Sequence, residues 1–178
     1  LFSASIYDLT KYNETITNAD TQLREVRGES GVQGIDLEAK AEITERLSMT
    51  AAYSYIESEI VESNLGNNDG NELASTPKHS GSIWVDYLVP GQGRFGDLSL
   101  GLGTRYSGEY WRSDANDSKT DSAWIWDAAI GYEIAEGTEM QLNVSNLFDE
   151  KHIAQGGFST DYYKPARETA PPLANTRQ

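Results

Sequence analysis

The segment from Leu98 to Tyr110 constrains the fold of the whole chain, because apolar and polar residues alternate along it. Leucine and tyrosine fill most even positions, whereas serine, glycine, arginine and glutamate fill the odd ones. A period of two predicts a β-strand with one apolar and one polar face. The alternation outlasts the roughly 5 to 6 residues of an ordinary strand and reaches the roughly 9 to 11 residues of a tilted membrane-spanning strand. The segment therefore favours an outer-membrane barrel over an enzyme.

Six further segments repeat this alternation, and no segment shows the 3.6-residue period of a helix. They are Phe2–Ile6, Ile35–Ile43, Leu47–Tyr55, Ile83–Tyr87, Trp126–Ile134 and Leu142–Val144. The fold class predicted from these segments is all-β, an antiparallel transmembrane β-barrel, of which the chain holds about seven to eight strands.

The connections between these strands are short and long in turn. The short ones are 43–47, 90–96 and 135–138, and the long polar ones are 11–24, 59–78, 112–123 and 148–161. Short turns at one rim and long loops at the other are typical of outer-membrane barrels. Aromatic residues gather near the strand ends and predict one side of an aromatic girdle: Tyr53, Tyr55, Tyr106, Tyr110, Trp111, Trp124 and Trp126.

Composition is compatible with this architecture. Hydrophobic residues make up 38% of the chain, which suits a barrel that buries only alternate residues in lipid. The net charge of −14 disfavours nucleic acid as a partner, and the absence of cysteine excludes a disulfide framework and thiolate metal sites. Charged residues of the second face are expected to point into the barrel lumen: Asp36, Glu38, Lys40, Asp86, Arg105, Glu109, Asp127 and Glu133.

The chain begins inside a strand pattern at Leu1, so we expect a piece of a larger barrel that needs further strands to close. A self-contained eight-stranded outer-membrane barrel with an anchoring or adhesion role is the main structural alternative. A soluble lipocalin-like barrel would carry the same alternation with the faces reversed.

Three motifs favour other functions only weakly. Gly91–Gly96 fits the dinucleotide pattern G-x-G-x-x-G, but a strand follows it where a helix is required. The loop from Asp114 to Thr120 alternates oxygen-bearing residues like a calcium loop, yet lacks the glycine and the final glutamate of that motif, so a solvated acidic loop is expected. An outer-membrane hydrolase would have to use His79 beside Ser80, and adjacent strand residues point to opposite faces. We therefore expect no enzyme.

Several segments together resemble the last third of TonB-dependent outer-membrane receptors. They are Gly34–Lys40, Ala51–Ile60, Thr76–His79 followed by Ser82–Tyr87, Gly101–Gly108, and Asn143–Glu150. The loop Asp114–Asp117 and the Asn-Leu-Phe-Asp motif from Asn146 look most like the ferrichrome and related ferric hydroxamate siderophore receptors.

The resemblance implies a 22-stranded barrel plugged by an N-terminal domain in the outer membrane of a Gram-negative bacterium. Such a receptor takes up a ferric hydroxamate siderophore, contacts lipid and lipopolysaccharide, and meets TonB only through its N-terminal part, which this chain does not contain. No cofactor is implied, and iron enters as part of the transported ligand. In these receptors the last long loop contributes an aromatic residue to the siderophore site, which makes Phe158 the candidate ligand-binding residue.

The resemblance extends through residues 1–167, the expected barrel portion, and stops there. Residues 168–178 include Pro171 and Pro172, which cannot both donate to a strand ladder. We expect this tail to be aberrant and disordered, and a frameshift near Arg167 is our hypothesis for its origin.

Overall fold

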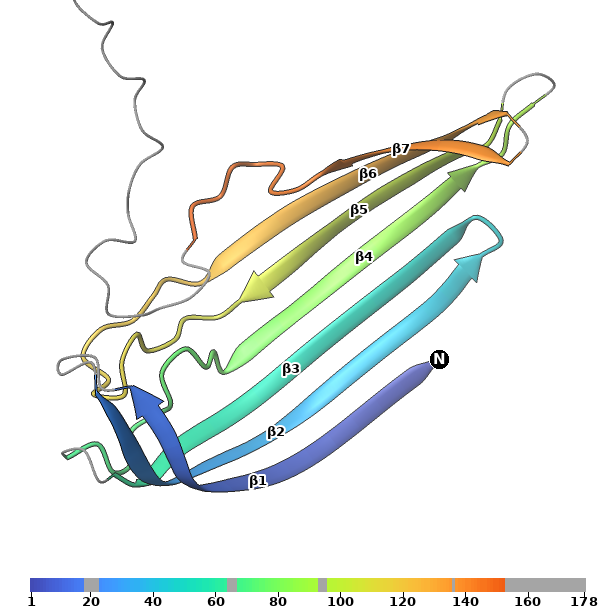
Figure 1. Cartoon of the computed structure of the whole chain (residues 1–178). Coiled ribbons are helices and arrows are strands. Elements are labelled where there is room, and N and C mark those ends of the chain that lie inside the picture. Colours follow the sequence, from blue (N-terminus) through green and yellow to red (C-terminus); the bar gives the residue numbers. More distant parts are fainter. Residues whose placement is uncertain (18–22, 64–66, 93–95, 136, 153–178) are drawn as a thin grey trace, which may run out of the picture.

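A computed structural model of the chain describes residues 1–17, 23–63, 67–92, 96–135 and 137–152. These residues form one antiparallel sheet in which every strand pairs with its neighbours in sequence (Figure 1). The strands are β1 (Phe2–Thr17), β2 (Arg24–Thr44), β3 (Leu47–Glu62), β4 (His79–Val89), β5 (Leu98–Ser107), β6 (Ala123–Ala135) and β7 (Thr138–Val144). The predicted all-β class and the seven strands are confirmed.

Strand register carries the apolar face across the whole sheet. Leu102 lies opposite Val85 on β4 and Ala128 on β6, and Leu100 lies opposite Tyr87 and Ile130. The same face continues onto β1, β2, β3 and β7, where Ile6 pairs with Ile35, Leu37 with Tyr53, and Leu142 with Ile130. Because a one-residue slip would invert the faces, this agreement between seven strands fixes the pairing.

Aromatic side chains bound this apolar band at its two ends. Tyr53, Tyr106 and Trp124 lie in one row across β3, β5 and β6, and the rings of Tyr106 and Trp124 are 4.7 Å apart. Towards the other end lie Tyr87 and Tyr132. Trp124–Tyr132 is a nine-residue stretch, and a tilted strand needs roughly 9 to 11 residues to cross a bilayer. The distance along the strand between the two aromatic belts therefore matches the thickness of a bilayer.

The opposite face of the sheet is polar and internally paired. Arg105 donates to both carboxylate oxygens of Asp127, over 2.9 and 3.3 Å, and Ser54 donates to Asp36 over 2.5 Å. The indole of Trp84 lies where side chains at Gly101 and Gly103 would stand, so these two glycines leave room for the ring. Of the charged residues expected on this face, Glu109 is the exception, because β5 ends at Ser107 and leaves Glu109 in a loop.

Two connections differ from the sequence prediction. The segment 11–24 was predicted to be a polar loop, but β1 continues to Thr17 and β2 starts at Arg24. Lipid no longer imposes an apolar face beyond the membrane band, so strands that continue there leave no alternating signal in the sequence. Conversely, the strand predicted to reach Tyr110 ends at Ser107.

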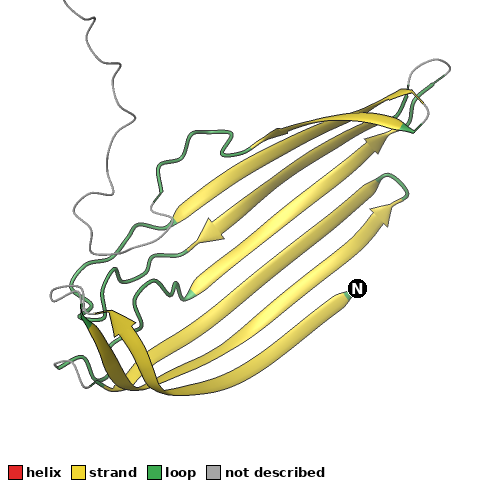
Figure 2. Ribbon diagram, viewed as in Figure 1, coloured by secondary structure: helices red, strands yellow, loops and turns green. Residues whose placement is uncertain are grey.

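All long connections and extended strand ends lie at one end of the sheet, whereas short turns and Leu1 lie at the other (Figures 1 and 2). The hairpin of β1 and β2 bends near its tip (Figure 1), and the pairing of β2 with β3 shifts register between Glu29 and Ser30. β1 and β7 form opposite edges of the sheet, so the seven described strands do not close by themselves. No helix in the described ranges has the length and apolarity to cross a membrane. The expected tail, 168–178, lies outside the described residues.

Candidate ligand-binding mouth

The hydrophobic core of the described residues lies at the long-loop end of the sheet. Its buried apolar members are Ile60, Tyr110, Ala123 and Ile125, and Ile60 is only 1% exposed. Within the band itself the outward apolar side chains stay exposed, for example Leu102 at 48%. The chain therefore packs against itself at this end, which we call the mouth.

The loop 63–78, which the structure describes over residues 67–78, returns to β3 and reaches its inner, polar face. Leu73 N–H donates to the hydroxyl of Ser58 over 3.1 Å, and Ser58 belongs to the inner face. The backbone of Ile60 binds this loop twice, since Ile60 N–H donates to Asn71 O and Ile60 O accepts from Gly70 N–H, both over 2.8 Å. The loop therefore pairs with the edge of β3 beside the buried Ile60, and through Leu73 it reaches the inner face at Ser58.

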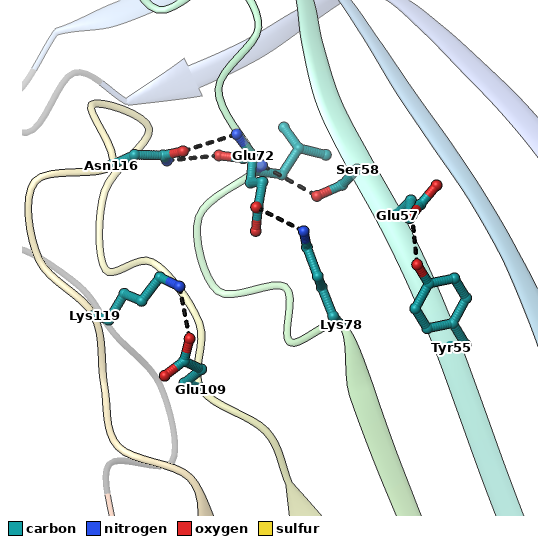
Figure 3. A network of polar contacts seen from close by, with 9 residues as sticks. Tyr55, Glu57, Ser58, Glu72, Lys78, Glu109, Asn116 and Lys119 are labelled. Carbon is teal, nitrogen blue, oxygen red and sulfur yellow. Dashed lines mark hydrogen bonds and ion pairs between the residues drawn. The ribbon is translucent and has the colours of Figure 1, made fainter.

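The loop 108–122 is attached to the loop 63–78 by the carboxamide of Asn116. Glu72 N–H donates to Asn116 Oδ1 over 2.9 Å, and Asn116 Nδ2 donates to Glu72 O over 2.8 Å (Figure 3). One side chain therefore satisfies both backbone groups of Glu72, as a neighbouring strand would. Asn116 has a φ of 53°, a left-handed conformation that asparagine tolerates better than most residues.

Asp114 and Asn71 add two further links between the same loops. Ala74 N–H donates to Asp114 Oδ1 over 3.1 Å, and Asn71 Nδ2 donates to Asp114 O over 2.9 Å. The loop from Asp114 was expected to be a solvated acidic loop, with calcium binding as the weaker alternative. Its Asp114 and Asn116 instead bind the backbone of the neighbouring loop. The described residues contain no cluster of acidic, histidine or cysteine side chains able to hold a metal ion.

Each of the two loops also contains one ion pair of its own. Lys78 contacts Glu72 at 2.9 Å, and Lys119 contacts Glu109 at 2.6 Å (Figure 3). The Lys119 ammonium also lies 4.6 Å from the centre of the Trp111 ring. The hydrogen bond to Glu72 raises the pKa of Lys78 above its ordinary value. Both pairs stay partly exposed, so each contributes little by itself.

Ser113 and Asp117 close the loop 108–122 on itself. Ser113 Oγ donates to Asp117 Oδ1 over 2.7 Å, and this bond lowers the pKa of Asp117. Asn116 N–H also donates to Ser113 O over 3.1 Å. The loop therefore forms a compact turn before it reaches its neighbour, which explains how a loop tip can hold Asn116 in place.

The turn after β7 is tied to the inner face as well. Asn146 N–H donates to Asp127 Oδ1 over 2.9 Å, and the side chain of Asn146 bonds both backbone groups of Glu150. Phe148 packs edge-on against Trp126, with ring centres 6.3 Å apart. The turn begins the last long connection, in which the candidate Phe158 lies outside the described residues.

The aromatic girdle predicted from the sequence is present except for two of its members. Tyr110 and Trp111 belong to the loop 108–122, and Tyr110 is 7% exposed, so neither stands in the belt. His79 was weighed as a catalytic base and instead shares a hydrogen bond of 2.8 Å with the Tyr53 hydroxyl. It belongs to the belt.

Sequence reasoning singled out Asn116 only as part of a calcium-like loop, and it missed the role of Asn116, Asn71 and Glu72 in joining the loops. Asn116 and Glu72 are 44 residues apart. The available signal was an asparagine within a short polar loop, a residue type suited to a left-handed turn.

Known proteins are similar to this chain in sequence and in fold. The family model described as TonB dependent receptor-like, beta-barrel, matches residues 1–147. The ferrioxamine receptor of Yersinia enterocolitica is 32% identical over 91% of this chain and 23% of its own length. The ferrichrome outer membrane transporter/phage receptor of Escherichia coli K12 is 32% identical over 85% of this chain and 21% of its own length.

The fold agrees with solved receptors. The siderophore receptor PiuA of Acinetobacter baumannii superposes with a TM-score of 0.72 at 26% identity, covering 88% of this chain and 23% of that structure. The ferric yersiniabactin uptake receptor FyuA of Yersinia pestis gives the same TM-score at 21% identity, over 84% of this chain and 22% of that structure. The chain thus spans less than a quarter of the length of these relatives. With its family model matched over residues 1–147, the chain belongs to the TonB-dependent receptors of the Gram-negative outer membrane.

Proposed function

We propose that this chain forms part of the wall of a receptor that takes up ferric siderophores across the outer membrane. The observation that carries the proposal is the two-faced sheet, which has an apolar band between aromatic belts outside, a polar face inside and folded loops over that inner face. Such a wall encloses an aqueous passage and presents a shaped mouth to a ligand.

Hydroxamate siderophores are the ligand class we favour. Two relatives named for the ferric hydroxamates ferrioxamine and ferrichrome are 32% identical to this chain, whereas a catecholate receptor of Escherichia coli is 28% identical. The iron would enter within its chelator, so the proposal needs no resident cofactor and no catalytic residue in this segment. The energy would come from TonB through a part of the receptor outside this chain.

The outward face supplies the contacts with lipid. Leu102 and Ile130 are each 48% exposed, and the belt of Tyr53, Tyr106 and Trp124 lies at the end of the band near the long loops. Aromatic rings favour the boundary between hydrocarbon and headgroups. We therefore propose acyl chains along the band and lipopolysaccharide headgroups beside this belt.

The inner face beyond the belt offers an apolar wall to the ligand. Leu9 pairs with Val32, and Ile56 lies on the same inner face of β3, opposite Gly34. Tyr7 extends over Gly34, where an added Cβ would overlap its ring. A compact chelate exposes apolar surface to such side chains, so we propose these residues and the untested Phe158 as ligand contacts.

Iron uptake by a receptor that carries this chain in its barrel tests the proposal. The receptor is produced in a strain without its own ferric hydroxamate receptors and supplied with radioactive iron as ferrioxamine B, ferrichrome or a catecholate chelate. We expect TonB-dependent uptake from the hydroxamates. Uptake from the catecholate alone would make the ligand class wrong, and no uptake from any chelate would contradict the transport function.

Two matched variants test the apolar wall. Val32→Asp places a charge on the inner face, whereas Gln33→Asp places it on the outer face of the same strand. We expect weaker ferric hydroxamate binding only from Val32→Asp. Equal binding by both variants would remove this wall from the site.

A further inference from the structure

The loops 63–78 and 108–122 are built as a single body at the mouth. Four hydrogen bonds between them involve three side chains, those of Asn116, Asp114 and Asn71, each bonded to the backbone of the other loop. Ser75 N–H adds a backbone bond to Trp111 O over 2.8 Å. Side chains that bond to backbone fix the path of a loop whatever residues the loop carries elsewhere.

This body is in turn fixed to the sheet. Leu73 is bonded to Ser58, and both backbone groups of Ile60 are bonded to the loop, so the first loop cannot leave β3 without breaking three hydrogen bonds. At the other loop, Thr120 N–H donates to Tyr110 O over 2.9 Å and closes the base of the loop. The loops are therefore held at both ends, and the contact between Asn116 and Glu72 joins the two supports.

We propose that Asn116 is a positioning residue for ligand binding, because its carboxamide holds the two loops as one preformed wall of the mouth. The proposal rests on the receptor function proposed above. A preformed wall needs less ordering when a ligand arrives, and rigid contacts act mainly on the rate of ligand dissociation. Loss of the carboxamide should leave the barrel intact and loosen the junction, which the bonds of Asp114, Asn71 and Ser75 then hold alone.

Asn116→Gly is the test variant, with Ala115→Gly as its control. Glycine keeps the left-handed backbone of residue 116 at no steric cost and removes only the side chain. Ala115 is exposed, so glycine there adds the same backbone freedom without touching the junction. Asn71→Ala is a second variant that removes one of the other links, the bond to Asp114 O.

A nitroxide label at Ser118→Cys reports loop motion, because this chain has no cysteine of its own and Ser118 is exposed. Receptor in lipid vesicles is compared without ligand and with ferric ferrioxamine B, and a heat-modifiability gel confirms a folded barrel. We expect a more mobile label in Asn116→Gly and about tenfold faster ligand dissociation, a size within reach of the hydrogen bonds lost, two to Glu72 and one to Ser113 O within the same loop. Ala115→Gly should match the parent in both, and Asn71→Ala should show a smaller change of the same kind.

The outcomes separate this inference from the proposed function. A parent receptor that binds no ferric siderophore contradicts the proposed function and with it the ligand role of Asn116. Normal binding by the parent together with an unchanged label spectrum in Asn116→Gly shows that the carboxamide does not join the loops. A mobile label with unchanged dissociation limits Asn116 to a structural role and overturns the proposal. If Asn116→Gly does not fold, the same two readouts on Asn71→Ala decide.

Discussion

The membrane band and the mouth of this protein are stabilised in different ways, although they share the same strands. In the band, Leu102 is 48% exposed to the surroundings of the chain, and order comes from backbone pairing and register. At the mouth, Ile60 is 1% exposed, and the neighbouring loop bonds to both of its backbone groups. The band relies on lipid for its burial, whereas the mouth provides its own.

This difference shows where specificity can change independently of assembly. Any residue of the band faces either lipid or lumen, so its side chain is restricted by membrane insertion. Residues of the mouth are restricted by each other. A receptor can therefore alter its loops for a new ligand without altering the wall that inserts into the membrane.

A charge in the middle of the band should have the largest effect. Leu102→Arg puts a guanidinium into hydrocarbon and should destabilise a vesicle-embedded receptor by roughly 2 to 4 kcal/mol in urea unfolding. Ala52→Arg on the inner face, opposite Glu38, should have little effect. Equal losses from the two variants would mean that the faces are assigned the wrong way round.

Truncation of the mouth core should act locally. Ile60→Ala should destabilise the fold of the loop 63–78 by about 2 kcal/mol or more, because a buried isoleucine is removed. Hydrogen exchange of loop peptides should accelerate while unfolding of the barrel stays near the parent value. Val61→Ala is the control, since Val61 is 48% exposed on the opposite face. A matching loss of barrel stability in Ile60→Ala would show that band and mouth unfold together.

The turn after β7 lies between the two regions and should respond moderately. Asp127→Ala leaves Asn146 N–H without its carboxylate partner, which is expected to destabilise by about 1 to 3 kcal/mol. Arg105→Ala removes only a partly exposed ion pair, worth about 1 kcal/mol or less. Proteolysis near residue 150 measures both. Because Asp127→Ala removes the ion pair as well, equal losses from the two variants would make the ion pair, rather than the turn, the main role of Asp127.

Changes of pH around neutrality should have the smallest effect on the loops of the mouth. The pKa of Asp117 is lowered from 3.8 by Ser113, so its contribution is present above that value and lost as pH falls through the lower folded pKa. The pKa of Lys78 is raised from 10.5 by Glu72, so its contribution is complete below that value and lost as pH rises through the higher folded pKa. Loop mobility from a label at residue 118 should stay constant between about pH 5 and pH 9. A transition inside that range would point to another titrating group, such as a histidine.

The sequence predicts the band well because lipid enforces a strict alternation. Every residue between Leu98 and Ser107 lies in a strand, with Leu102 on the apolar face as expected. Even the polar Thr104 fits the apolar face, since its hydroxyl donates to Ile125 O over 3.1 Å. Where the strands leave the band this signal ends, so the extension of β1 to Thr17 was predicted to be a loop.

The mouth could not be predicted in the same way. Its main link joins Asn116 to the backbone N–H and C=O of Glu72. Because every residue type except proline offers these two groups, the contact does not determine which residue stands at position 72. The burial of Ile60 likewise depends on a loop that folds back, although Ile60 is close to the end of an alternating strand. Local patterns identify which residues face inwards and do not identify what covers them.

The indole of Trp84 lies in the space left by Gly101 and Gly103 on the next strand. The ring and the two bare backbone positions are complementary shapes, so neither can be replaced alone without a gap or an overlap. Alanine at Gly101 would require a smaller residue at position 84, and a smaller residue at position 84 would leave the glycines uncovered. Among related receptors, we expect these positions to vary jointly and to be inherited as a unit, even though they lie on different strands.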